Sequence, residues 1–118
     1  MKFTQVHHVA IITSDYEKTI DFYVKKLEFE ILRENHRPEK NDVKLDLKFG
    51  DMELEVFVVP NAPKRPNYPE AQGLRHLAFK VDDVHEAAKW LNERGIETEP
   101  IRFDLYTQNY AAFFHDPD

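Results

Sequence analysis

The 118-residue chain carries one short pattern twice, and this internal repeat constrains its fold more than any other feature. His8-Val9-Ala10-Ile11 matches His76-Leu77-Ala78-Phe79 at an offset of 68 residues. The same offset carries Asp15 onto Asp83 and overlays two segments with helical patterns. Agreement of residues, helices and strand order at one offset indicates a duplicated structural unit, because a fixed period is typical of repeated architecture.

The first copy is predicted to have the order strand, helix, strand, strand, strand. Residues 6–12 form an apolar run that fits a buried strand, and Ser14 with Glu17 is a capping-box pattern at a helix start. We then expect a helical stripe over 16–27, a strand over 29–33, a loop over 34–42, and strands 43–49 and 52–59 joined by a turn at Gly50-Asp51.

The second copy follows a proline-rich connector, residues 61–73. We expect a strand over 74–81, a helix that begins at Asp83 with Glu86 and stops at Gly95, and strands over 96–103 and 110–114. The sequence therefore predicts one α+β domain over 1–118, with module 1 at about 3–60 and module 2 at 74–118. The last strand of module 2 is expected near position 123, beyond Asp118.

Composition excludes several classes of function. The net charge is −6 without a basic patch, which argues against a nucleic-acid partner. No apolar run approaches the roughly 20 residues that span a bilayer. Cysteine is absent, so disulfides, thiolate ligands and cysteine nucleophiles are excluded. Together these features predict a cytoplasmic protein without membrane association.

The alternation of side chains along the predicted strands places candidate metal ligands on shared faces. His8 and His76 each have an alanine two positions on, which leaves room beside the imidazole on the same face. Two equivalent histidines would face each other if the two modules pair about a common axis. Glu53 and Glu55 share a face of a neighbouring strand, so a carboxylate could complete the cluster. Two imidazoles and a carboxylate suit one divalent ion among Zn²⁺, Ni²⁺, Fe²⁺, Co²⁺ and Mn²⁺.

The chain resembles the vicinal oxygen chelate superfamily and, within it, the glyoxalase I-like (lactoylglutathione lyase-like) proteins. The segments that carry the resemblance are His8-Val9-Ala10-Ile11, Glu55-Val56-Phe57, the run from Gly73 to Asp83, and Phe113-Phe114-His115-Asp116-Pro117-Asp118. The resemblance implies two βαβββ modules that form a curved mixed sheet, the glyoxalase/bleomycin-resistance/dioxygenase fold. It also implies a homodimer.

The resemblance assigns the metal ligands to His8, Glu55 and His76, with Glu53 as the fallback for Glu55. It implies a lyase or isomerase that binds a small substrate through two vicinal oxygens and stabilises an enediolate at the metal. Glu55 is the catalytic carboxylate within the chain, and the family's late glutamate, expected near position 123, is the stronger candidate base.

Two other functions fit the same fold. An extradiol-type dioxygenase would use two histidines and a late glutamate around iron, and Glu55 argues against it because that position is not normally a ligand there. A metal-free module of the bleomycin-resistance kind would only bind a small molecule, and His8 with His76 argues against that. Cationic side chains in and beside the connector, at Lys64, Arg65 and Arg75, could bind an anionic substrate group.

Overall fold

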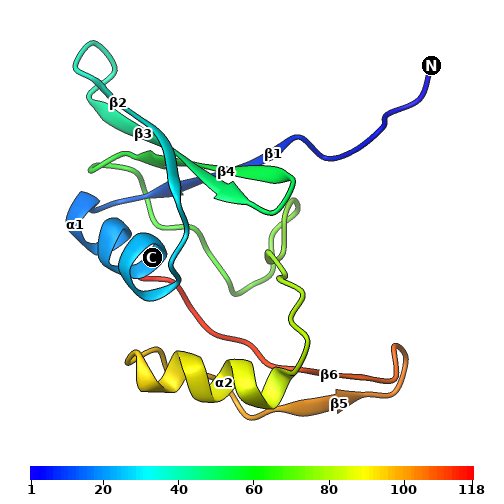
Figure 1. Cartoon of the computed structure of the whole chain (residues 1–118). Coiled ribbons are helices and arrows are strands. Elements are labelled where there is room, and N and C mark those ends of the chain that lie inside the picture. The colour runs from blue at the N-terminus through cyan, green and yellow to red at the C-terminus, as the bar shows by residue number, and fades with distance from the viewer. The chain divides into compact units, whose positions relative to one another are not determined.

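The computed structural model describes all 118 residues as two compact units. The first unit comprises Met1–Ala62 with Pro117–Asp118, and the second comprises Pro63–Asp116. The boundary falls inside the proline-rich connector, which contains no helix or strand. The fold class is α+β with few helices and a mixed sheet, as predicted (Figure 1). None of the helices combines the length and the apolar character needed to cross a membrane.

The first unit is built on a four-stranded sheet with the order β1-β4-β3-β2. Its strands are β1 (His8–Thr13), β2 (Ile31–Arg37), β3 (Asp42–Phe49) and β4 (Met52–Val58). β1 runs parallel to β4, whereas β2, β3 and β4 form antiparallel neighbours. The parallel pair places the first strand of the unit beside the last one, so residues separated by more than forty positions share one face.

The hairpin between β3 and β4 has the turn that the sequence predicts. Gly50 has φ +56°, a left-handed backbone conformation that glycine adopts without steric cost. The turn sets the register Phe49 opposite Met52 and Asp46 opposite Glu55. One face of this hairpin carries the buried aliphatic residues Leu45, Leu47, Leu54, Val56 and Val58, which form the core of the unit.

The helical segment of the first unit has two parts, α1 (Tyr16–Thr19) and the π-helical η1 (Ile20–Lys26). The expected stripe at a period of 3.6 is only partly correct, because Leu27 N donates to the carbonyl of Phe22, five residues back, at 2.9 Å. The wider turn buries Phe22 and Tyr23 next to each other, each 6% exposed.

The cap of this helix is Asp15 and not Ser14. The Asp15 carboxylate accepts a hydrogen bond from Lys18 N at 2.9 Å, whereas Ser14 Oγ donates to Asp118 at 2.5 Å. Both residues can cap a helix, but the carboxylate also interacts favourably with the positive end of the helix dipole.

The second strand is longer than expected. Residues 34–37 belong to β2 and not to a loop, and the turn occupies only 38–41. Arg37 closes the hairpin through two hydrogen bonds of 2.7 Å to the Asp42 carboxylate, and Asn41 takes a positive φ of 53° in the turn. This bidentate ion pair stabilises the end of the β2–β3 ladder, where Arg37 lies opposite Asp42. The polar character of residues 34–42 had indicated a loop there.

The second unit contains α2 (Val84–Glu93) and a short hairpin of β5 (Arg102–Asp104) and β6 (Asn109–Ala111) (Figure 1). The predicted cap is confirmed, since Asp83 accepts hydrogen bonds from the backbone of His85 and Glu86. Gly95 ends the helix with φ +78°. The ring centroids of His85, at the start of α2, and Tyr110 of β6 lie 4.9 Å apart, so the two elements touch at this point.

The expected strand over 74–81 is wrong, because this segment has no paired neighbour. In the first unit β1 pairs with β4, whereas no strand pairs with residues 74–81 in the second unit. An extended segment without a paired neighbour has no ladder to join. The strands expected over 96–103 and 110–114 are shorter in the structure, where they are β5 and β6. One isolated bridge joins Thr98 and Phe114.

Candidate metal and substrate site

His8 and Glu55 lie side by side on the parallel strands β1 and β4. The register pairs Ala10 with Glu55 and His8 with Glu53, so both side chains extend from the sheet face opposite the aliphatic core. His8 Nε2 is 3.5 Å from Glu55 Oε2. The side chains are 42% and 16% exposed, so the pair is open to a small molecule.

The second ring nitrogen of His8 is engaged by His7. The Nδ1 atoms of the two rings are 2.9 Å apart, and the rings meet edge to face. One Nδ1 donates and the other accepts, so this contact couples the tautomer of His8 to that of His7. His7 precedes β1, so the alternation of side chains along the strand does not describe the direction of its ring.

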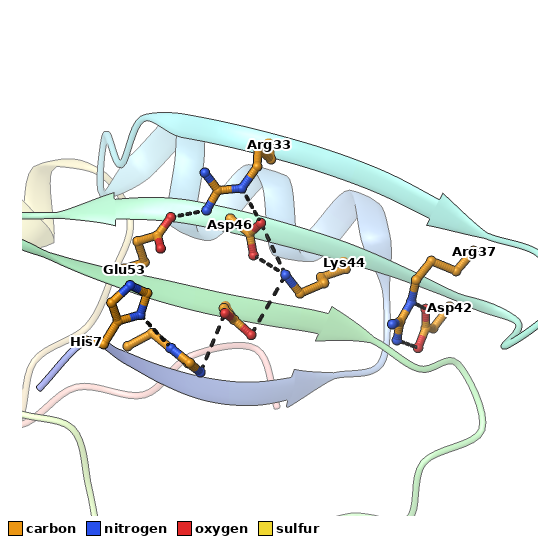
Figure 2. Close-up of polar contacts among 9 residues, drawn as sticks. His7, Arg33, Arg37, Asp42, Lys44, Asp46 and Glu53 are labelled. Atoms are coloured by element: carbon orange, nitrogen blue, oxygen red, sulfur yellow. Dashed lines mark hydrogen bonds and ion pairs between the residues drawn. The ribbon is translucent and has the colours of Figure 1, made fainter.

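A buried carboxylate on β3 anchors the polar side of the site. Asp46 is 1% exposed, although it shares a face of β3 with Lys44 and Lys48. Arg33 Nε donates to Asp46 Oδ2 at 2.8 Å, and Lys44 Nζ donates to the two carboxylate oxygens at 2.9 and 3.2 Å (Figure 2). Two cations therefore satisfy the charge that β3 buries.

These contacts also set the ionisation of Asp46. Burial alone would raise the pKa of its carboxyl group, but the hydrogen bonds from Lys44 and Arg33 outweigh burial and hold the pKa below its usual value. Asp46 therefore keeps its negative charge in the folded chain over the physiological pH range.

Lys44, which contacts Asp46, also forms an ion pair with Glu55. Lys44 Nζ lies 3.9 Å from Glu55 Oε1, on the far side of the Glu55 carboxylate from His8. Glu53, the fallback ligand, has a different partner, since its Oε1 forms an ion pair with Arg33 (Figure 2). Glu55 is therefore the glutamate that lies next to an imidazole.

His76 lies in the second unit. It is exposed, and its ring meets the ring of Phe113 edge to face, with 5.5 Å between their centroids. Arg75, beside it, forms an ion pair of 2.7 Å with Glu70 of the connector. Within neither unit do three or more histidine, aspartate or glutamate side chains gather to hold a metal ion. The structure thus brings together two of the three predicted ligands, His8 and Glu55.

The donor chemistry of His8 and Glu55 fits a divalent metal ion. Imidazole nitrogen and carboxylate oxygen bind Zn²⁺ at about 2.0–2.2 Å, so two such donors on a tetrahedral ion lie roughly 3.4 Å apart. The 3.5 Å between Nε2 and Oε2 agrees with that spacing. The pair supplies two donors and leaves the other positions of an ion to further ligands or to substrate.

Comparison with known proteins identifies the family of this chain. Residues 5–118 match the sequence profile of the Glyoxalase/Bleomycin resistance protein/Dioxygenase superfamily. The uncharacterized protein YwkD of Bacillus subtilis is 50% identical over 119 residues, which cover 100% of this chain and 93% of the relative. A lactoylglutathione lyase of Neisseria meningitidis is 26% identical over 116 residues, covering 94% of this chain and 82% of the relative.

Solved structures agree with this match. A glyoxalase family protein from Enterococcus faecalis has a TM-score of 0.95 and 61% identity, with 100% of this chain and 94% of that chain covered. TnmS3, an antibiotic binding protein from Streptomyces, has a TM-score of 0.74 and 26% identity, with 100% of this chain and 91% of that chain covered. The chain is thus similar both to an enzyme and to a binding protein.

Proposed function

Since the chain belongs to the Glyoxalase/Bleomycin resistance protein/Dioxygenase superfamily, we propose that it is a divalent-metal-dependent lyase or isomerase of the glyoxalase I kind. Its substrate is a small molecule with two vicinal oxygens. The observation that carries the proposal is the contact between His8 Nε2 and Glu55 Oε2 at 3.5 Å. This contact places an imidazole nitrogen and a carboxylate oxygen at the spacing of two ligands of one ion, on the sheet face opposite the aliphatic core.

His8 and Glu55 would hold the ion, and His76 is proposed as a further ligand on the sequence repeat alone, since it matches His8 at the offset of 68. A divalent ion in this site would act as a Lewis acid toward the substrate oxygens. Zn²⁺, Ni²⁺, Fe²⁺, Co²⁺ and Mn²⁺ all accept nitrogen and oxygen donors.

Glu55 is proposed to move the proton. Its carboxylate takes a proton from one substrate carbon and returns it to the neighbouring carbon, while the hydroxyl proton of the first carbon passes to the oxygen of the second, so the product is an isomer and no co-reactant is consumed. His7 keeps the His8 ring oriented through its Nδ1 contact while the proton moves.

The test combines metal dependence with a matched set of variants. Metal-free protein is loaded in turn with each of the five ions and assayed on the thiohemiacetal of methylglyoxal and glutathione, the substrate class that the similarity to a lactoylglutathione lyase suggests. Isomerisation should appear with at least one ion and fall at least a hundredfold in H8A, E55Q and H76A.

His36 and His85 provide the controls, one in each unit. Both are exposed histidines that contact a carboxylate other than Glu55, His36 with Glu34 and His85 with Asp83. H36A and H85A should retain activity. Turnover that does not depend on a metal ion, or that survives in H8A and E55Q, would refute the proposal.

A metal-free binding function is the second candidate, because the antibiotic binding protein TnmS3 is 26% identical to the chain. An extradiol-type dioxygenase is the third. Elemental analysis of the purified protein separates these classes. A bound metal favours the lyase or isomerase, iron together with oxygen consumption favours the dioxygenase, and the absence of metal affinity favours the binding module.

We also propose that the chain forms a homodimer, as the family resemblance suggests. Light scattering coupled to size-exclusion chromatography measures the mass directly. A mass near twice 14.0 kDa supports the dimer, and a mass near 14.0 kDa contradicts it.

A further inference from the structure

Lys44 is the cation nearest to Glu55, and its hydrogen bonds leave it with spare donor capacity. An ammonium group has three N–H donors. Both hydrogen bonds of Lys44 Nζ go to the Asp46 carboxylate, at 2.9 and 3.2 Å. Its distance to Glu55 Oε1, 3.9 Å, is too long for a hydrogen bond. At least one donor of a side chain that is 26% exposed therefore remains available beside Glu55.

Asp46 fixes the position of this ammonium group. The carboxylate is itself 1% exposed and is held from the other side by Arg33 Nε at 2.8 Å. A lysine on a strand surface normally samples many rotamers, whereas the double contact with a buried carboxylate restrains this one (Figure 2). The negative charge of Asp46 also balances the positive charge of Lys44. This balance allows the ammonium group to lie close to the proposed site for a divalent metal ion.

We propose that Lys44 is a further ligand-binding residue of the site and that its ammonium group donates a hydrogen bond to a negatively charged oxygen of the molecule bound at Glu55. The proposal rests on the metal site proposed above and specifies its ligand. That ligand is a small molecule with vicinal oxygens, at least one of which carries negative charge when bound. A donor fixed before the ligand arrives stabilises such an oxygen without rearrangement of the site.

A purely structural role for Lys44 makes a different prediction. If the lysine only balances the buried Asp46, its removal changes the stability of the fold and leaves ligand binding intact. If it binds an anionic oxygen, its removal weakens that ligand specifically. Removal of a cation does not weaken the attraction of the site for a divalent metal ion. The affinity for the anionic ligand should therefore fall, while the affinity for the metal ion stays the same or rises.

Acetohydroxamate is a suitable probe, since it presents two vicinal oxygens and one negative charge. Its dissociation constant is measured on the Zn²⁺-loaded full chain for the wild type, K44M and K44R. K44M should weaken acetohydroxamate binding about tenfold or more, the usual effect of one lost charge-assisted hydrogen bond, while Zn²⁺ binds as tightly as before or more tightly. K44R keeps the charge and should retain most of the affinity.

Lys48 is the matched control, because it lies on the same face of β3 as Lys44 and opposite Glu53 rather than Glu55. K48M should bind both Zn²⁺ and acetohydroxamate like the wild type. If K44M fails to fold, the double variant K44M/D46N removes the lysine together with its counter-charge and should show the same loss.

Equal acetohydroxamate affinity in the wild type, K44M and K48M overturns the role of Lys44 and leaves the metal site standing. The metal site itself is judged by H8A and E55Q. If these two variants bind Zn²⁺ like the wild type, the proposed function fails, and the role of Lys44 fails with it.

Discussion

Asp46 and Glu55 stand directly opposite each other on β3 and β4, yet their environments differ sharply. The Asp46 side chain is 1% exposed and paired with two cations, whereas Glu55 is 16% exposed and lies between Lys44 and His8. Two like charges that face each other across a ladder would normally repel. Lys44 separates them, so one carboxylate supports the structure and the other stays available for chemistry.

Replacement of the two glutamates on β4 should separate their roles. E55Q removes a proposed metal ligand and should lower Zn²⁺ affinity at least tenfold. E53Q disturbs only the ion pair with Arg33 and should bind Zn²⁺ like the wild type. Isothermal titration calorimetry of both variants measures this. A loss in E53Q but not in E55Q would transfer the ligand role to Glu53.

His7 should affect metal binding without binding the metal itself. In H7F the Nδ1 of His8 loses its partner at 2.9 Å, and outer-shell partners of this kind change metal affinity by about tenfold to a hundredfold. We therefore expect H7F to weaken Zn²⁺ binding about tenfold with little change in melting temperature. H36F is the control, since His36 contacts Tyr16 and Glu34 instead. Unchanged affinity in H7F would contradict the role of His7.

Loss of the Asp46 charge should destabilise the fold. D46N leaves Arg33 and Lys44 without their shared counter-charge, and the cost of a lost buried hydrogen-bond partner is about 2 kcal/mol. Urea denaturation followed by circular dichroism measures the change in the free energy of unfolding. D51N, in the exposed turn after Gly50, should be nearly neutral. A D46N variant as stable as the wild type would show that the buried charge contributes nothing.

The same carboxylate should make stability depend on pH in acid. The folded chain holds the pKa of Asp46 below its usual value, so the unfolded chain takes up a proton first as the pH falls. The contribution of Asp46 is fully present above the ordinary carboxyl pKa of about 4 and is lost below it. The difference in unfolding free energy between wild type and D46N should therefore be constant near neutral pH and shrink below about pH 4. A difference that does not change with pH would contradict this account.

The sequence contained enough information to find part of the site that alternation alone missed. A two-residue turn at Gly50-Asp51 pairs Phe49 with Met52, and this register puts Asp46 opposite Glu55. The turn was predicted, and the register follows from it. The burial of Asp46 was not predictable, because it depends on Arg33, a residue of a strand whose pairing the sequence pattern does not specify.

Elements that depend on non-local partners were predicted least well. The cap at Asp83 and the hairpin turn are local signals, and both were found. The segment 74–81 has a strand-like pattern, but it forms no strand because no other segment pairs with it in the way that β4 pairs with β1. The π-helical turns of η1 likewise depend on how Phe22 and Tyr23 pack, which a period of 3.6 does not describe.

A calorimetric Zn²⁺ titration of the wild type and H8A shows whether His8 and Glu55 bind one divalent metal ion. We expect one ion per chain for the wild type and an affinity at least tenfold weaker for H8A. A wild type that takes up no Zn²⁺, or an H8A variant that binds it equally well, would contradict the account.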